Sequence, residues 1–166
     1  MRLLTAPRHL NLAGFTLCTL LLLTAYYFQY ALDMEPCPLC MTQRLAFYAC
    51  GLLFLGAAVH HPRLTGQRIY AGLTLLFSVF GAAVASRQLW LQSLPEDQVP
   101  ACAPSLDYML EVLPWADILS VMLRGSGDCA EVQWVFLGLS IPGWSLVAFV
   151  TLAIVSLILL RRRPIS

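Results

Sequence analysis

The sequence predicts an all-α membrane protein, a bundle of four transmembrane helices with short amphipathic helices in one long loop outside the membrane. Of its 166 residues, 59% are hydrophobic and only 11% are charged, whereas soluble domains carry about 25% charged residues. Four apolar stretches dominate the chain, and each approaches the roughly 20 residues that cross a bilayer. The polar sequence between them is too short to cover four such stretches in a soluble fold.

The expected spans form one domain over residues 1–166, because no linker divides the chain and no internal repeat is visible. The spans cover about 10–32, 43–60, 69–88 and 143–160, and they leave loops at about 33–42 and 89–142. The first stretch is longer than the core of a signal peptide, about 7 to 15 residues, and no small-residue cleavage site follows it. We therefore expect it to remain in the mature chain.

Charge places the loops relative to the membrane. Arginines precede the first span, separate the second from the third and follow the fourth: Arg2, Arg8, Arg63, Arg68, Arg161, Arg162 and Arg163. By the positive-inside rule these three segments are cytoplasmic. All nine carboxylates lie in the two opposite loops. The sequence thus predicts a multi-pass membrane protein with both termini in the cytoplasm.

Two short amphipathic helices are expected within the long loop. Apolar residues recur there at helical spacing, first Leu106, Met109, Leu110 and Leu113, then Trp115, Ile118, Leu119 and Met122. Ser105 is a suitable cap for the first helix, and Pro114 can open the second. Two arrangements remain open: the helices lie on the bilayer surface, or they pack on each other as a lid.

Four of the six cysteines lie outside the apolar stretches, Cys37 and Cys40 in the first outer loop and Cys102 and Cys129 in the second. A C-x-x-C pair at the start of a helix favours a thiolate, because the unpaired N–H groups and the helix dipole stabilise negative charge. This indicates thiol–disulfide exchange. Half a zinc site and a static disulfide are the alternatives, but the second pair lacks C-x-x-C spacing and no metal is predicted.

The segment that precedes Cys129 contains two glycines, Gly125 and Gly127. Glycine permits a wide range of backbone conformations. The sequence therefore predicts that Cys129 is mobile.

Arg44 follows Cys40 by four residues, which places both on one helix face with Arg44 a turn deeper. It can be an interfacial anchor whose guanidinium reaches the headgroups. Alternatively it is a fixed positive charge that stabilises the Cys40 thiolate and an anionic oxygen of a membrane-soluble oxidant.

These motifs together resemble the bacterial disulfide bond formation protein B (DsbB) family over essentially the whole chain. The resemblance is carried by Glu35-Pro-Cys-Pro-Leu-Cys40, Gln43-Arg44, the cysteine pair of the long loop, Ser126-Gly-Asp-Cys-Ala-Glu-Val-Gln-Trp134 and Phe136-Leu-Gly-Leu139. It implies a four-helix oxidoreductase of the bacterial inner membrane that reoxidises DsbA, a thioredoxin-like dithiol oxidase of the periplasm. The electrons pass to ubiquinone or menaquinone.

The resemblance also implies a role for each outer cysteine. The resting disulfides are Cys37–Cys40 and Cys102–Cys129. The thiolate of the partner attacks Cys102, and the released Cys129 attacks Cys37. A bridge between Cys37 and Cys129 then frees Cys40.

On the quinone side, the resemblance places the Cys40 thiolate next to the quinone, with Arg44 stabilising the charge. Gln88 and Arg87, where the third span leaves the membrane, are further candidates to line the quinone site.

Two other functions remain open. A quinone-linked thiol reductase of the vitamin K epoxide reductase type runs the same chemistry in reverse, but its membrane-proximal C-x-x-C belongs to a later helix. A non-catalytic metal-binding membrane protein is the other alternative. Nothing in the chain resembles a nucleic-acid-binding patch.

Overall fold

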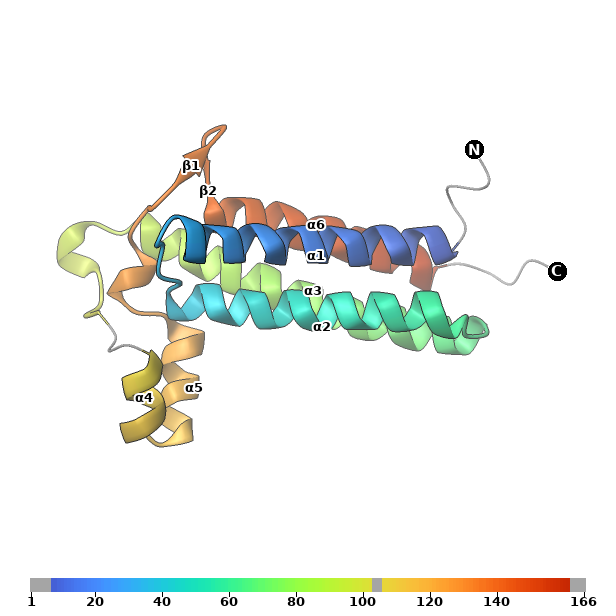
Figure 1. Ribbon diagram of the computed structural model, residues 1–166, viewed down its shortest axis with the longest axis horizontal. Coiled ribbons are helices and arrows are strands. Elements are labelled where there is room, and N and C mark those ends of the chain that lie inside the picture. The colour runs from blue at the N-terminus through green and yellow to red at the C-terminus, as the bar shows by residue number, and fades with distance from the viewer. Residues whose placement is uncertain (1–6, 103–105, 162–166) are drawn as a thin grey trace.

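The computed structural model describes residues 7–102 and 106–161 and places four long helices side by side (Figure 1). These are α1 (Pro7–Ala31), α2 (Pro38–His60), α3 (Leu64–Gln92) and α6 (Ile141–Leu160). Each is long and apolar enough to cross a membrane. The predicted all-α membrane fold is confirmed. Four residues used in the predictions, Arg2, Ser105, Arg162 and Arg163, lie outside the described ranges.

Helices α2 and α3 extend beyond the apolar stretches from which they were predicted. α2 begins at Pro38, five residues before the expected span, because a proline in the first helical turn needs no N–H partner. Cys37 caps this helix, and its Sγ accepts a hydrogen bond from the backbone N–H of Cys40 at 3.4 Å. α3 continues to Gln92, four residues past the expected end. The extra turn of α2 carries Cys40, and Gln43, Arg44 and Gln88 lie just inside the expected spans.

Packing within the bundle is uneven. α6 packs along α3, α3 along α2 and α2 along α1, whereas α1 and α6 make few contacts with each other. At the centre, the rings of Phe47 and Phe149 stack with centroids 4.0 Å apart. A Cβ on Gly81 would lie 2.3 Å from the Phe149 ring, so the missing side chain lets α3 and α6 approach closely. The weak contact between α1 and α6 leaves one side of the bundle open.

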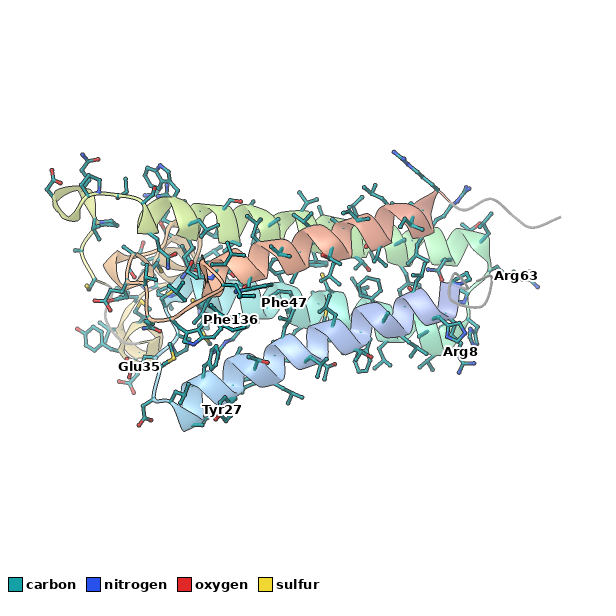
Figure 2. All side chains as sticks on the ribbon, turned by 90° about the horizontal axis from the view of Figure 1, so that it is seen from above. Arg8, Tyr27, Glu35, Phe47, Arg63 and Phe136 are labelled. Atoms are coloured by element: carbon teal, nitrogen blue, oxygen red, sulfur yellow. The ribbon has the colours of Figure 1, made fainter. Side chains whose placement is uncertain are left out.

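Charge is separated along the bundle. Figure 2 shows Arg8 and Arg63 at one end and Glu35 near the other. α1 begins and α6 ends at the arginine end, as Figure 1 shows. The predicted cytoplasmic segments therefore share one end of the molecule.

The segment between α3 and α6 forms several short elements at the opposite end. They are η1 (Glu96–Gln98), α4 (Leu106–Val112), α5 (Trp115–Arg124), η2 (Gly127–Cys129), β1 (Val135–Phe136) and β2 (Leu139–Ser140). Figure 1 shows α4 and α5 next to each other, with their axes across the bundle axis.

The two amphipathic helices pack on each other and on the bundle. Met109 of α4 and Ile118 of α5 are buried, and Thr42 Oγ1 of α2 donates a hydrogen bond of 2.8 Å to the carbonyl of Met122. Pro114 has an extended backbone immediately before α5. Trp115 nevertheless remains 77% exposed. The contact between the helices, one of the two arrangements left open, is therefore present, and apolar surface is still left uncovered.

The β1–β2 hairpin was not predicted. Its strands are antiparallel, with Val135 opposite Ser140 and Phe136 opposite Leu139. Leu137 and Gly138 form the turn with φ of 52° and 81°. Trp144 of α6 ties the hairpin to the bundle, because its Nε1 donates a hydrogen bond of 3.1 Å to the carbonyl of Phe136.

Candidate functional site

Three of the four predicted site cysteines meet at the N-terminus of α2. The Sγ atoms of Cys37 and Cys40 are 3.0 Å apart. Cys129 approaches from η2, and its side chain shares a hydrogen bond with Cys37. The apolar side chains of Leu39, Val84 and Leu91 surround this group. Segments separated by about ninety residues of sequence thus place three sulfur atoms within one cluster.

Cys129 is fully buried, at 0% exposure, although its two neighbouring glycines predicted a mobile residue. The backbone explains the difference. Gly125 has a φ of 79° and ends α5 at a sharp turn, and the N–H of Cys129 then donates to the carbonyl of Ser126 at 3.0 Å. The glycine conformation serves to direct Cys129 into the protein.

Cys102 lies apart from this cluster and is exposed. Its segment nevertheless packs directly against η2, because the N–H of Gly127 donates to the carbonyl of Ala101 at 3.1 Å. A Cβ on Gly127 would lie 2.5 Å from the carbonyl oxygen of Pro100 and 3.1 Å from the Sγ of Cys102. Glycine at position 127 therefore permits the two cysteine-bearing segments of the long loop to touch.

The environments of Cys102 and Cys129 drive their pKa values apart. A hydrogen bond from the Cys37 thiol lowers the pKa of Cys129 to about 6, against the opposing effect of burial, and backbone groups of Ser126 and Leu39 lower it further. The same contact with Cys129 raises the pKa of Cys37. At Cys102, a hydrogen bond with the Asp128 carboxylate raises the pKa. In the fully reduced protein Cys129 is accordingly the more readily ionised of these two thiols.

This difference gives a pH-dependent prediction. In the fully reduced protein Cys129 should be a thiolate at pH 7 and should lose its charge as the pH falls through about 6. We expect Cys37→Ala to raise the pKa of Cys129 toward the ordinary value, about 8.5, because the main donor to its sulfur is gone. The measurement is the ultraviolet absorbance of the thiolate as a function of pH, taken as the difference from a Cys129→Ala variant.

Cys50→Ala is the matched control for that titration, because Cys50 is a buried cysteine of α2, the helix that Cys37 caps, and lies within its membrane-spanning part. It should leave the Cys129 titration unchanged. A titration that is the same with and without the Cys37 thiol would show that Cys37 does not donate to Cys129.

A large apolar cavity adjoins the cysteine cluster on the side where α1 and α6 make few contacts. It has a volume of about 470 Å³ and is lined by α1, α2, α6 and the hairpin segment. Cys40, Gln43 and Arg44 contribute to its wall. In Figure 2, Phe47 and Phe136 lie between α1 and α6, and both line this cavity. A volume of about 300 to 1,000 Å³ is usual for sites that bind small organic ligands.

Aromatic side chains close the outer end of this cavity. The ring centroids of Phe28 and Trp134 are 5.1 Å apart, those of Trp134 and Phe136 5.6 Å, and those of Phe136 and Trp144 6.2 Å. This row runs from α1 through the hairpin to α6. It therefore bridges the two helices that otherwise hardly touch.

Arg44 is held toward the cavity by α1. Its guanidinium donates to Gln29 Oε1 and, at 3.0 Å, to the carbonyl of Ala25, and it lies 5.2 Å from the ring centroid of Tyr26. These contacts come from one neighbouring helix. They hold the guanidinium of Arg44 against α1, so the side chain is not extended toward the lipid headgroups.

The sequence offers Gln88 as a candidate to line the quinone site. It does not line the large cavity but lies behind the cysteines, with Nε2 3.4 Å from Cys37 Sγ and 3.3 Å from Cys40 Sγ. A small cavity of about 20 Å³ adjoins it, which exceeds the roughly 10 to 15 Å³ that one water needs. The carboxylate residues Asp128 and Glu131 line that cavity too.

Two further placements complete the site. Arg87 is exposed at the end of α3, where its guanidinium lies 4.4 Å from the ring centroid of Trp90 and away from the large cavity. Gln43, which the sequence offered only as part of a motif, is buried and contacts Gln88. No pattern in the sequence distinguishes Gln43 from any other polar residue near the start of a helix.

Comparison with known proteins connects this geometry to a family. A family model described as disulfide bond formation protein DsbB matches residues 7–159. Disulfide bond formation protein B of Hahella chejuensis is 59% identical over 140 residues, which cover 84% of this chain and 85% of the relative. That of Marinobacter nauticus is 54% identical over 149 residues, or 90% and 89% of the two chains. Disulfide bond formation protein B 1 of Pseudomonas aeruginosa is 44% identical over 160 residues, or 96% and 98%. The residues matched by the family model include both cysteine pairs.

Proposed function

The chain belongs to the disulfide bond formation protein DsbB family, and on that premise we propose that it reoxidises a DsbA-like dithiol oxidase of the periplasm and passes the electrons to membrane quinone. Family membership makes the chain a multi-pass membrane protein of disulfide bond formation, with oxidoreductase activity. The identity of the partner and of the electron acceptor belongs to the proposal.

One observation carries the proposal. Cys40 lies 3.0 Å from Cys37 through its sulfur and at the same time forms part of the wall of the apolar cavity. A cysteine in that position can exchange with other protein sulfurs on one side and meet a lipid-soluble molecule on the other. An inert structural disulfide would need no such cavity.

The first exchange takes place at Cys102. Its exposure makes it accessible to the thiolate of a folded partner, whereas Cys129 is buried. The partner sulfur forms a bond to Cys102, the Cys102–Cys129 bond breaks, and Cys129 leaves with the electron pair. The burial of Cys129 and the exposure of Cys102 favour this direction over attack at Cys129.

The second exchange takes place within the cluster. The Cys129 thiolate attacks Cys37, a bond forms between these two sulfurs, and the Cys37–Cys40 bond breaks. Cys40 leaves as a thiolate beside the apolar cavity. The hydrogen-bonded contact between Cys129 and Cys37 supports this step, because only a small displacement separates contact from bond formation.

The large cavity fits a ubiquinone or menaquinone, because its wall is almost wholly apolar apart from a few polar side chains near Cys40. A quinone held by this wall would supply an acceptor for two electrons and two protons. Cys40 presents the electron-rich sulfur. Arg44 stabilises negative charge next to it, and the aromatic row of Phe28, Trp134, Phe136 and Trp144 keeps water out of the outer end.

The cycle closes on the enzyme's own sulfurs. The second thiol of the partner attacks the mixed disulfide, and the partner departs oxidised while Cys102 is released as a thiol. The Cys102 thiolate then attacks Cys129, the Cys37–Cys129 bond breaks, and Cys37 is released. Cys37 and Cys40 join as a disulfide, and the two electrons that this releases would go to the quinone. Two electrons have left one dithiol and two have reached one quinone, so both resting disulfides, Cys37–Cys40 and Cys102–Cys129, are restored.

The proposal requires both cysteine-bearing loops to face the periplasm across a bacterial inner membrane. The shared arginine end of the bundle supports cytoplasmic termini through the positive-inside rule. The oxidising periplasm would then hold the partner.

Trapping the partner tests the proposed function. In cells that produce the Cys129→Ala variant beside the parent enzyme, Cys102 of the variant is a free thiol and can attack the disulfide of the oxidised partner. The partner disulfide breaks, a bond forms to Cys102, and no Cys129 is present to displace the partner, so we expect a thioredoxin-like periplasmic protein to accumulate as a mixed disulfide on Cys102. The measurement is identification of the attached protein after non-reducing electrophoresis. The Cys102→Ala/Cys129→Ala variant should trap nothing, and capture of no thioredoxin-like protein by Cys129→Ala would contradict the proposed substrate.

A further inference from the structure

Two glutamines form a buried amide pair beside the cysteines. Gln43 of α2 and Gln88 of α3 are 4% and 3% exposed, and Gln43 Nε2 donates a hydrogen bond of 2.7 Å to Gln88 Oε1. Burial makes such a pair costly unless its polar groups are satisfied. Their contact fixes how each amide is turned.

The orientation of Gln88 decides which of its atoms faces sulfur. Its Nε2 lies 3.3 Å from Cys40 Sγ and 3.4 Å from Cys37 Sγ, and an amide nitrogen has two N–H groups to donate. Its Oε1 accepts the short hydrogen bond from Gln43 and a longer one, at 3.6 Å, from the Cys40 thiol. A Cys40 thiolate or disulfide has no S–H to donate, and the contacts that Gln88 then makes to the two sulfurs are those of its N–H groups.

We propose that Gln43 is a positioning residue that holds the Gln88 amide with its N–H groups toward Cys37 and Cys40, and so makes the disulfide of this pair easier to reduce. The inference rests on the proposed function, since it assumes that this pair cycles between disulfide and dithiol. It adds no redox step of its own.

The physical reason is the charge that reduction creates. Opening the disulfide yields a thiolate, and a hydrogen bond to a charged acceptor is about twice as strong as one between neutral groups. Burial strengthens it further, because little water competes. A disulfide is a weak acceptor and gains much less. Stabilising the reduced form raises the reduction potential of the pair, and that favours electron flow from the partner toward Cys40.

Without Gln43, the described residues offer Gln88 Oε1 no hydrogen-bond donor other than the Cys40 thiol, and that donor is lost when Cys40 ionises. The amide can then turn, and its carbonyl oxygen would repel a thiolate. In the Gln43→Met variant we therefore expect the equilibrium between the Cys37–Cys40 disulfide and its dithiol to shift toward the disulfide by about tenfold, which corresponds to about 30 mV.

The experiment measures that equilibrium in glutathione buffers, with neither quinone nor partner present, in a Cys102→Ala/Cys129→Ala background that leaves one outer pair. The fraction of reduced Cys37 and Cys40 is read by thiol alkylation and mass spectrometry. Gln67→Met is the matched control. Gln67 is a buried glutamine of α3, the helix that carries Gln88, and it lies near the other end of that helix. It should leave the equilibrium within about twofold, the ordinary tolerance for an independent site.

A double-mutant cycle separates positioning from a general loss of packing. Gln88→Leu should shift the equilibrium in the same direction as Gln43→Met. If Gln43 acts through Gln88, adding Gln43→Met to Gln88→Leu should cause no further shift. Gln43→Asn, which keeps an amide but is one carbon too short, provides a second variant should the methionine variant fail to fold. It should behave like Gln43→Met.

Two results would overturn the inference while leaving the proposed function intact. One is a wild-type equilibrium in Gln43→Met and Gln43→Asn, and the other is a full additional shift in the double variant. A parent protein whose Cys37–Cys40 pair does not exchange with glutathione at all would instead overturn the proposed function, and this inference with it.

Discussion

Cys40→Ser is expected to abolish quinone reduction, with a loss on the order of 1,000-fold or more, as for other enzymes that lose their nucleophile. A serine hydroxyl is un-ionised near neutral pH and cannot form a disulfide with Cys37. The Cys102–Cys129 disulfide should remain, because neither of its sulfurs is altered. The variant should therefore oxidise about one equivalent of a dithiol partner and then stop. The measurement counts the partner thiols that remain in stopped samples and compares them with the quinol formed, read by its absorbance.

The matched control is Cys50→Ser, which changes a buried cysteine further along α2 whose thiol forms hydrogen bonds with Ser78 and the carbonyl of Thr74. It should retain quinone reduction close to that of the parent. Continued turnover of quinone by Cys40→Ser would show that another sulfur delivers the electrons. Loss of even the first equivalent would show that partner oxidation already requires Cys40.

The bundle could be predicted because its cause is simple. Long apolar stretches in a membrane can satisfy their backbone groups only as helices, so composition alone predicts four spans. The helix ends were less accessible to prediction. Pro38 and Cys37 set the start of α2 through a local cap, whereas hydropathy detects only the lipid-facing middle of a helix.

The hairpin and the burial of Cys129 escaped prediction for a different reason. A two-residue hairpin turn with positive φ at both positions is usually announced by Asn-Gly or Asp-Gly, but here Leu137 occupies the first of these positions with a φ of 52°. Leucine gives no signal of such a turn. Similarly, the glycines before Cys129 predicted freedom, because sequence shows the conformations that a residue permits and not the tertiary contacts that select one.

Within the site, sequence identified the reactive atoms better than the atoms that support them. Cysteines and an arginine beside a C-x-x-C motif are rare enough in an apolar chain to stand out. Gln43 and Gln88 become a pair only when α2 and α3 pack, through a bond between residues 45 positions apart. Such contacts depend on helix rotation, which spacing along one helix does not determine.

Arg44→Met is the second substitution with a large expected effect. It should reduce the rate of quinone reduction by about 100- to 1,000-fold, the usual cost of removing a group that stabilises developing negative charge. The exchange between the partner and Cys102 should be nearly unaffected, because Arg44 lies on the wall of the apolar cavity. Steady-state quinone reduction and single-turnover partner oxidation, measured on the same preparation, separate the two steps.

Arg87→Met is the control for a general loss of positive charge. Arg87 stacks on Trp90 and donates to the carbonyl of Arg124, and it does not line the large cavity. Quinone reduction should therefore stay within about twofold of the parent, as expected for a surface substitution away from the site. An equal loss in Arg87→Met and Arg44→Met would contradict a specific role for Arg44.

Arg44→Lys distinguishes a charge at the cavity from an anchor at the membrane boundary. Lysine keeps the charge, and it would serve an anchor equally well, since both long side chains reach headgroups. It lacks the planar fork with which Arg44 bonds Gln29 and the carbonyl of Ala25 together. If α1 orients the charge for the chemistry, Arg44→Lys should retain stability in detergent yet still lose about tenfold in quinone reduction, the equivalent of about 1.4 kcal/mol of transition-state stabilisation. Full activity in the lysine variant would instead mean that any positive charge at position 44 of α2 is enough for quinone reduction, and that the contacts from α1 contribute only to packing.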